Sequence, residues 1–210
     1  MTKKSFILTA ALMLMSMASC AQQTIELPQP DLKLLNKSLG DALMQRRSGR
    51  SYDASRPLSD VQLSTLLWAA CGVSDKQSGK ITAPSAVNMQ DIRVYVCTPT
   101  GVCLYNAREN RLEKVSDDNL MAALADRQDF AKDAPVNLLL VSWQEDRPRK
   151  SEKWGKVDSG YVSQNIYLAA TAMGLQTVAR GSMDEAAVRK ALNLPTDVLV
   201  LLNHPVGYAK

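Results

Sequence analysis

The chain has 210 residues, of which 46% are hydrophobic and 22% are charged, values that are ordinary for a globular protein and favour a single folded domain. Its formal net charge is +4, and loss of Lys3 and Lys4 with an N-terminal signal would leave 23 basic and 21 acidic residues. A charge of +2 without a concentrated basic patch argues against nucleic acid as a partner.

The first twenty residues are predicted to be a targeting signal and not part of the fold. Lys3 and Lys4 precede an apolar run over residues 6–17 that is too short to span a bilayer comfortably. The run ends in Met-Ala-Ser-Cys, which resembles a bacterial lipobox with the lipid on Cys20. We therefore expect a lipoprotein signal peptide over residues 1–19 and a lipid-anchored protein of the bacterial envelope, on the periplasmic side or at the outer membrane. An ordinary secretory signal cleaved nearby is the alternative.

The mature chain is expected to begin with a tether. Residues 20–32 contain two prolines and polar residues without periodicity, so we interpret them as the lipid attachment and a linker. Residues 33–210 would then form the domain.

Within that domain, apolar periodicity, caps and breakers predict helices and strands in mixed order. The predicted helices cover residues 34–47, 59–72, 117–125, 159–173 and 184–192, and the second begins with a capping box of Ser59 and Gln62. The predicted strands cover residues 93–98, 102–106, 136–141, 176–179 and 198–202. Because helices and strands do not alternate strictly, α+β is the expected fold class.

Cysteine and histidine limit the chemistry that the chain can carry. Cys97 and Cys103 flank a predicted turn, and in an oxidising envelope they could form a disulfide or remain two free thiols. No cysteine pair has metal-ligand spacing, and the single histidine, His204, excludes a His-rich metal site, so we predict no metal. We expect His204 to be a loop residue, because no Gly-x-Ser-x-Gly motif accompanies it.

Two polar segments are candidates for a binding site. Arg46-Arg47-Ser48-Gly49-Arg50 offers three guanidiniums and a hydroxyl to an anion such as phosphate, although a basic helix end is also favoured by the helix dipole. Residues 84–90, Pro-Ser-Ala-Val-Asn-Met-Gln, offer amides and a hydroxyl that suit the mixed donors and acceptors of a flavin. Asn and Gln are also ordinary turn residues. A third segment, residues 158–177, is rich in small residues, and core packing explains it equally well.

In this order and spacing the segments resemble the nitroreductase family. The family's Arg-Arg-Ser-x-Arg motif is matched at residues 46–50, and its Pro-Ser-Ala-x-Asn-x-Gln motif at residues 84–90. Its central helix before Gly-Leu is matched at residues 165–175, and Val-Gly-Tyr stands at residues 206–208. Lipoprotein-borne members related to the azoline-forming dehydrogenases look most similar. Two departures are Ala209 and Asp91-Ile92, where the family often has Pro and Pro-Trp.

The resemblance implies a mostly antiparallel central sheet flanked by helices, an intertwined homodimer, and FMN at the dimer interface. By position, FMN would be contacted by Arg46, Arg47, Ser48 and Arg50, by Pro84, Ser85, Asn88 and Gln90, and by Arg180, Gly181 and Lys210. Asn88 and Gln90 would reach the flavin from the partner subunit. The backbone of Arg180 and Gly181 would lie near flavin N5, and Lys210 near the phosphate.

The activity implied is that of an FMN-dependent oxidoreductase without a catalytic side chain, since the cofactor performs the chemistry. The substrate would be small and electron-poor, and NAD(P)H is the family's usual electron donor. Because nicotinamide nucleotides are scarce outside the cytoplasm, a flavin-dependent dehydrogenase acting on a peptide or small molecule is an alternative. A non-catalytic flavin-binding lipoprotein is another.

Overall fold

A computed structural model describes residues 23–144 and 152–210. The predicted signal peptide and the lipid attachment at Cys20 lie outside the described residues. Within the described ranges, no helix combines the length and the apolar character needed to span a membrane.

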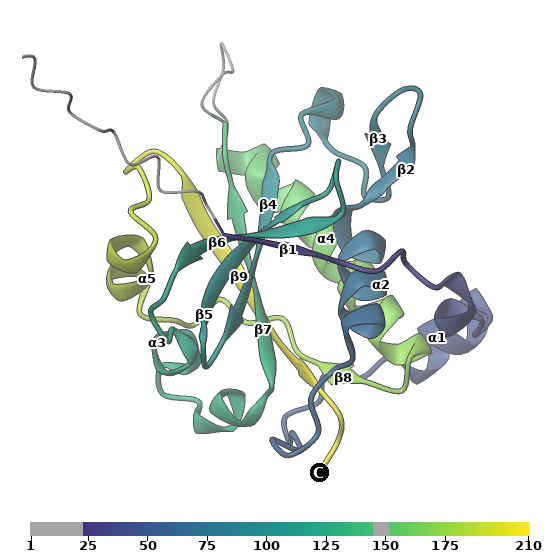
Figure 1. The fold of residues 1–210 in the computed structure, drawn as a ribbon, viewed down its shortest axis with the longest axis horizontal. Helices are drawn as coiled ribbons and strands as arrows, with labels where there is room; N and C mark the ends of the chain where they lie inside the picture. The colour runs from purple at the N-terminus through teal and green to yellow at the C-terminus, as the bar shows by residue number, and fades with distance from the viewer. Residues whose placement is uncertain (1–22, 145–151) are drawn as a thin grey trace, which may run out of the picture.

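The centre of the molecule is a seven-stranded sheet in the order β1-β6-β5-β4-β7-β9-β8, and every neighbouring pair is antiparallel (Figure 1). Its strands are β1 (Thr24–Glu26), β4 (Ile92–Thr98), β5 (Gly101–Asn106), β6 (Arg111–Ser116), β7 (Val136–Ser142), β8 (Gln176–Thr177) and β9 (Leu199–Gly207). A separate hairpin joins β2 (Val73–Asp75) to β3 (Lys80–Ile81). The predicted α+β class with a mostly antiparallel sheet is confirmed.

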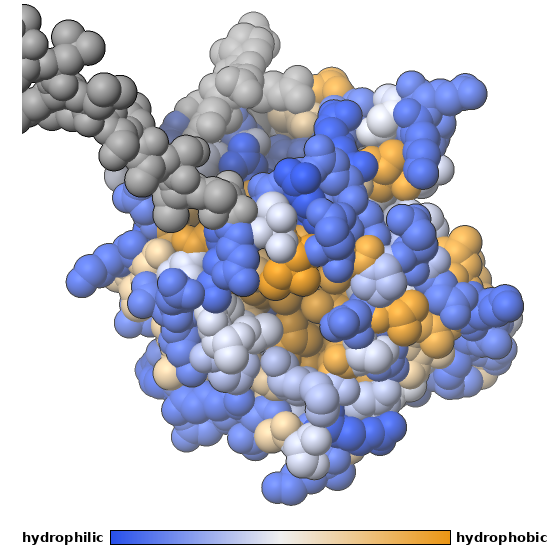
Figure 2. Space-filling view, viewed as in Figure 1, coloured by the Kyte–Doolittle hydropathy of each residue, from blue (hydrophilic) through white to orange (hydrophobic). Residues whose placement is uncertain are grey.

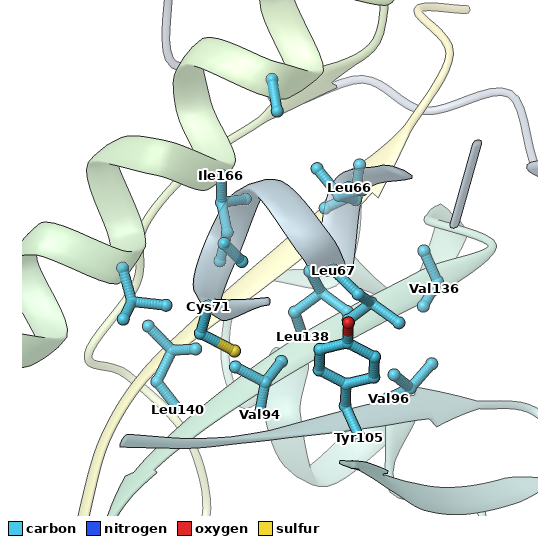
Figure 3. Close-up of a cluster of buried hydrophobic side chains, with 14 of the residues drawn as sticks. Leu66, Leu67, Cys71, Val94, Val96, Tyr105, Val136, Leu138, Leu140 and Ile166 are labelled. Atoms are coloured by element: carbon cyan, nitrogen blue, oxygen red, sulfur yellow. The ribbon is translucent and has the colours of Figure 1, made fainter. Parts of the chain in front are cut away.

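Helices cover both faces of this sheet. They are α1 (Leu39–Gln45), α2 (Asp60–Cys71), α3 (Met121–Ala125), α4 (Glu152–Ala172) and α5 (Glu185–Ala191), with short 3₁₀ helices η1 (Leu32–Leu35), η2 (Ala86–Asn88) and η3 (Asp129–Asp133). One core cluster lies between the sheet and α2 with α4, and a second lies between the sheet and α3 with α5. In Figure 3, Leu66 and Leu67 of α2 and Ile166 of α4 face Val94 and Leu138 of the sheet.

Strand β7 is buried along its whole length, as its unbroken apolar run predicts. Leu138 and Leu140 belong to the core under α2 and α4, whereas Leu139 and Val141 belong to the core under α3 and α5. Side chains alternate between the two faces of a strand, so a strand covered on both sides needs apolar residues at every position. The central strand therefore follows from the sequence alone.

Local hydrogen bonds shorten two of the predicted helices. The helix expected over residues 34–47 is instead η1 followed by α1, because Ser38 caps α1 by accepting a bond from the Asp41 N–H at 3.0 Å. The helix expected from residue 117 begins at Met121, where Asn119 Oδ1 accepts the backbone N–H. Short polar side chains that bond to nearby backbone groups compete with helix formation.

The predicted tether over residues 20–32 is wrong from residue 24 onward. Residues 24–26 form β1, which pairs with the outer side of β6, and Leu27 is buried. The Ser64 hydroxyl on α2 also donates to the Pro28 carbonyl at 2.5 Å. An unpaired edge of β6 would leave backbone donors and acceptors open, and the extended segment satisfies them. β1 borders an apolar hollow at the centre of the face shown in Figure 2.

The hairpin between β4 and β5 decides the question of the disulfide. Thr98 pairs with Gly101, so the loop has two residues, Val96 lies opposite Cys103, and Cys97 lies opposite Val102. A shift of one position places the two thiols on opposite faces of the sheet. Both cysteines are free, and each belongs to a different core cluster.

Candidate functional site

The arginine segment at residues 46–50 leaves α1 and runs beside β8. Ser48 pairs in parallel with Thr177, and the Gly49 N–H donates to the Thr177 carbonyl at 3.0 Å. A Cβ atom at position 49 would overlap the side chain of Gln176, so glycine permits this close approach. The backbone therefore ties the segment to the sheet.

Within the described residues, no carboxylate lies within ion-pair distance of the positive charges of this segment. In the described ranges, no ion pair involves Arg46, Arg47, Arg50 or Lys210. The C-terminus lies beside the segment, because the Lys210 N–H donates to the Ser51 carbonyl at 3.3 Å. Unpaired guanidiniums, an ammonium and a hydroxyl form a donor set that suits phosphate.

Arg47 shows that the helix-dipole explanation also holds in part. Its Nη1 atom donates to the carbonyl oxygens of Met44 at 2.7 Å and of Arg46 at 2.8 Å, at the end of α1. This is the usual stabilising role of a cation near a helix C-terminus. Arg46 and Arg50 have no such bond to the last turn of α1, which leaves them as the stronger candidates for a ligand.

The second predicted segment, residues 84–90, is a loop that hydrogen-bonds to Asp158 of α4. Both carboxylate oxygens of Asp158 accept the Ala86 N–H, at 3.1 and 3.0 Å, and Ser85 Oγ accepts the Gln90 N–H at 2.9 Å. The Gln90 side chain donates to the carbonyl of Gly79 at 3.0 Å and to the side chain of Asn88 at 3.1 Å. Gln90 thus supports its own loop, whereas Asn88 is exposed and points away from the core.

The tip of this loop has a strained backbone. Val87, Asn88 and Gln90 have φ angles of 47°, 57° and 51°, in the left-handed region, and the Val87 residue is 89% exposed. A branched residue rarely adopts this conformation, and such strain tends to occur at sites of function. The loop therefore presents Val87 and Asn88 outward in a fixed conformation.

The two predicted groups do not come together within one chain. The loop is held at Asp158, whereas Ser48 bonds to Tyr167, nine residues further along α4. At 1.5 Å per residue, these anchor points are about 14 Å apart along the helix axis. In Figure 1 the start of β4 and the C-terminus lie at opposite ends of the molecule.

Arg180 has a role that its position in the sequence does not show. Its Nη1 and Nη2 atoms each donate at 2.6 Å, to the carbonyls of Leu124 and Ala125, and Nη1 also donates to Asn203 Oδ1 at 2.9 Å. Its backbone N–H and carbonyl both bond to Asn203. Arg180 therefore ties α3 to β9. The neighbouring Gly181 is exposed, and its N–H has no acceptor in the described part of the chain.

A pair of buried carboxyls lies under the 84–90 loop. Asp91 and Asp158 are both almost fully buried, and Asp91 accepts bonds from Ser142 Oγ and Gln144 Nε2. Burial raises the pKa of the Asp158 carboxyl, and the neighbouring Asp91 raises it further. The second oxygen of Asp91 has no hydrogen-bond partner in the described residues.

His204 lies in a buried strand, and our prediction of a loop residue was wrong. Strand β9 continues to Gly207, five residues beyond the predicted end, because its pairing with β7 runs from Leu199 to Val206. His204 Nε2 bonds with Ser163 Oγ at 2.8 Å and Nδ1 with Thr177 Oγ1 at 3.1 Å. Burial lowers the pKa of His204 to about 3. A neutral, inaccessible imidazole excludes a hydrolytic triad at this position.

Tyr167, a half-buried residue on α4, is a candidate that no motif indicates. Its hydroxyl is 3.0 Å from Ser48 Oγ and accepts the Ala179 N–H at 2.8 Å. The Arg46 guanidinium lies over its ring, 5.1 Å from the centroid. Tyr167 therefore connects the arginine segment to the chain that leads into Gly181.

Comparison with known proteins gives a consistent result. The sequence model of the nitroreductase family matches residues 43–208. A nitroreductase-family protein of Methanocaldococcus jannaschii is 32% identical over 197 residues, which cover 88% of this chain and 96% of that protein. The crystal structure of a protein from Ralstonia eutropha, assigned to the nitroreductases, is 33% identical, with a TM-score of 0.79 and coverage of 90% of each chain.

A more distant solved structure shares the fold. The NADPH:FMN oxidoreductase of Vibrio harveyi, in complex with NAD⁺, is 24% identical with a TM-score of 0.60, and the match covers 80% of this chain and 67% of that one. At this identity the likeness shows the fold alone. The two relatives above 30% identity and the family match over most of the domain show that the chain belongs to the nitroreductase family.

Proposed function

We propose that the protein is an FMN-dependent oxidoreductase that moves a hydride, or two electrons, between flavin N5 and a small, electron-poor organic substrate. The observation that carries this proposal is the cationic segment at residues 46–50, joined by Lys210 and without a carboxylate partner in the described ranges. The Vibrio protein with the same fold is an NADPH:FMN oxidoreductase, which supports the same cofactor.

The residues of this chain bind and orient the flavin, which supplies the redox chemistry when bound. Arg46, Arg50 and Lys210 would hold the phosphate by charge-assisted bonds, and Ser48 would bond to the ribityl chain or the pyrimidine edge. The open N–H of Gly181 would face the flavin near N5. No acidic, basic or nucleophilic side chain is required to act on the substrate.

We also propose that two copies of the chain form a homodimer and complete each site together. The loop that carries Asn88 bonds to one end of α4, and the arginine segment bonds nearer the other end. Asn88 is therefore too far from the arginine segment of its own chain and would reach the flavin of the partner subunit. Large apolar side chains are exposed on two helices: Leu39, Leu43 and Met44 on α1, and Trp154, Val157 and Tyr161 on α4. A groove of about 330 Å³ between α1, α2 and α4 adds to this apolar surface. A second copy would cover it.

The N-terminal sequence supports a proposal for the location of the protein, and the location bears on the electron donor. We propose that Cys20 carries the lipid anchor in the bacterial envelope, on the periplasmic side or at the outer membrane. NAD(P)H is the first donor to test, and a donor of the envelope would replace it if the protein is exported.

The test is the visible absorption spectrum of residues 21–210, purified with FMN supplied. Flavin absorbance that dithionite bleaches and a quinone or nitroaromatic restores is the expected result. A colourless protein that also fails to bind added FMN would refute the proposal. Bound flavin that no acceptor reoxidises would leave a flavin carrier without turnover.

Charge removal tests the assigned site. Each charge-assisted bond contributes about 1.5–3 kcal/mol, so Arg46→Ala with Arg50→Ala should weaken FMN binding by roughly 10²- to 10⁴-fold. The control is Arg127→Ala with Lys190→Ala, which removes the same charge from two exposed positions on the α3 and α5 side of the sheet. FMN occupancy equal to that of the wild type in the first double variant would exclude this site.

A further inference from the structure

We propose that Tyr167 is a positioning residue that holds the arginine segment and the Gly181 segment at the separation that FMN requires. This inference rests on the proposed function, because both segments are assigned to the flavin there. Tyr167 itself is given no contact with the flavin. Its effect passes through the two backbone segments that its hydroxyl joins.

The hydroxyl of Tyr167 is the point where the two segments meet. It accepts the N–H of Ala179 at 2.8 Å, and it lies 3.0 Å from the hydroxyl of Ser48. A phenol has one proton and can accept two bonds, so both contacts form at once with either oxygen as donor. Ala179 stands two residues before Gly181, and Ser48 is the centre of the arginine segment. One oxygen atom therefore fixes both sides of the proposed site.

The ring of Tyr167 is held in place from behind. His204 contacts it edge to face, with centroids 5.4 Å apart and an interplanar angle of 80°. His204 is itself fixed by Ser163 and Thr177. The Arg46 guanidinium also lies over the ring, 5.1 Å from its centroid, an attraction that orients a side chain proposed to bind phosphate. These two contacts restrain the ring and so keep its hydroxyl at one position.

A backbone hydrogen bond also joins the two segments, so they should stay together in a variant that lacks the Tyr167 hydroxyl. Such a variant can therefore be purified and its FMN binding measured. Gly49 N–H donates to the Thr177 carbonyl at 3.0 Å, so the strands stay paired when the phenol oxygen is removed. Tyr167→Phe keeps the ring, its contact with His204 and its stacking with Arg46. The variant removes only the contacts to Ser48 and Ala179, and we expect it to fold.

The experiment compares Tyr167→Phe with Tyr105→Phe. Tyr105 lies in the core on β5, and its hydroxyl donates to Asn110 Oδ1 at 3.0 Å, so the control also loses a tyrosine hydroxyl bond. For Tyr167→Phe we expect faster amide hydrogen exchange at Ala179 in the flavin-free protein and a Kd for FMN about tenfold higher. Tyr105→Phe should leave both quantities unchanged even if it lowers the melting temperature.

A double-mutant cycle with Ser48→Ala separates positioning from general loosening. If the contact between the two hydroxyls positions Ser48, the loss of FMN affinity in the double variant is smaller than the product of the two single losses. Independent, multiplicative losses would overturn the inference, and so would a Tyr167→Phe protein that binds FMN as the wild type does. A wild-type protein that binds no FMN overturns the proposed function and, with it, this inference.

Discussion

The pH dependence of folding stability offers a direct test of the burial of His204. The imidazole is fully buried, and its two nitrogens bond to the hydroxyls of Ser163 and Thr177. Neither partner carries a negative charge that would stabilise the protonated imidazole. Burial therefore lowers the pKa of His204 to about 3. The unfolded chain keeps the ordinary value of about 6.5.

The sign of the effect follows from these two values. Between pH 6.5 and pH 3 the unfolded state binds a proton that the folded state does not bind, so acid favours unfolding. The free energy of unfolding should fall by about 1.4 kcal/mol for each pH unit in this window. At pH 4.5 the loss would be about 2.7 kcal/mol. Stability from this group is complete above pH 6.5.

Urea denaturation of untagged residues 21–210 at pH 7, 5.5 and 4.5 measures this loss. His204→Gln is the comparison, because the difference in slope between the two proteins cancels titrations that they share. The chain has a single histidine, so its imidazole proton resonances report on His204 alone. No chemical-shift titration should occur in the folded protein above pH 5. A midpoint near 6.5, or parallel loss of stability in both proteins, would refute the reasoning.

Two further substitutions test buried polar contacts. Asp91→Asn removes the neighbouring carboxyl that raises the pKa of Asp158, so the stability that Asp158 loses as the pH rises should be smaller in the variant. The difference in the free energy of unfolding between variant and wild type, measured in urea, should therefore increase in favour of the variant between pH 4 and pH 7, and a constant difference would mean that the two carboxyls do not interact. In Arg180→Lys, the lysine side chain cannot replace the bonds from Nη1 and Nη2 to Leu124, Ala125 and Asn203. We expect the free energy of unfolding, measured by thermal unfolding, to fall by about 3 kcal/mol. A decrease below about 1 kcal/mol would contradict a structural role for this guanidinium.

The elements that the sequence predicts correctly are those fixed by local chemistry. The capping box of Ser59 and Gln62 begins α2, and the Asp184 side chain caps α5 by accepting the Ala187 N–H at 3.0 Å. Gly174, with a φ of +69°, ends the longest helix at the predicted place. Each signal involves residues a few positions apart, so one sequence contains all the information needed.

The errors in the strands have a common cause in long-range pairing. β1 exists because β6 offers an open edge, and β9 extends past its apolar run because β7 pairs with it as far as Val206. The positions of Cys97 and Cys103 depend on a register that a one-residue change in loop length reverses. None of these partners can be identified from the periodicity of one segment.

In the candidate site, too, local features could be predicted from the sequence and long-range contacts could not. Motifs locate the arginine segment and the 84–90 loop, because both are continuous in sequence. The structural role of Arg180 depends on carbonyls more than fifty residues earlier in the chain. Tyr167 joins residues 48 and 179, which lie on either side of it in sequence, and its own segment indicates only a helix. Residues that position a site are harder to predict than residues that would contact a ligand.

The separation along α4 has a consequence for how the proposed dimer works. Asp158 holds the loop that carries Asn88, and Tyr167 holds the arginine segment, about 14 Å further along the same helix. In a twofold dimer each contact occurs twice, with the roles of the two subunits exchanged. If the two α4 helices pack antiparallel, the 84–90 loop of one subunit reaches the arginine segment of the other. The length of α4 between Asp158 and Tyr167 then determines how the loop and the arginine segment are placed at each site. A change at Asp158 would then weaken flavin binding at the site whose arginines belong to the partner subunit.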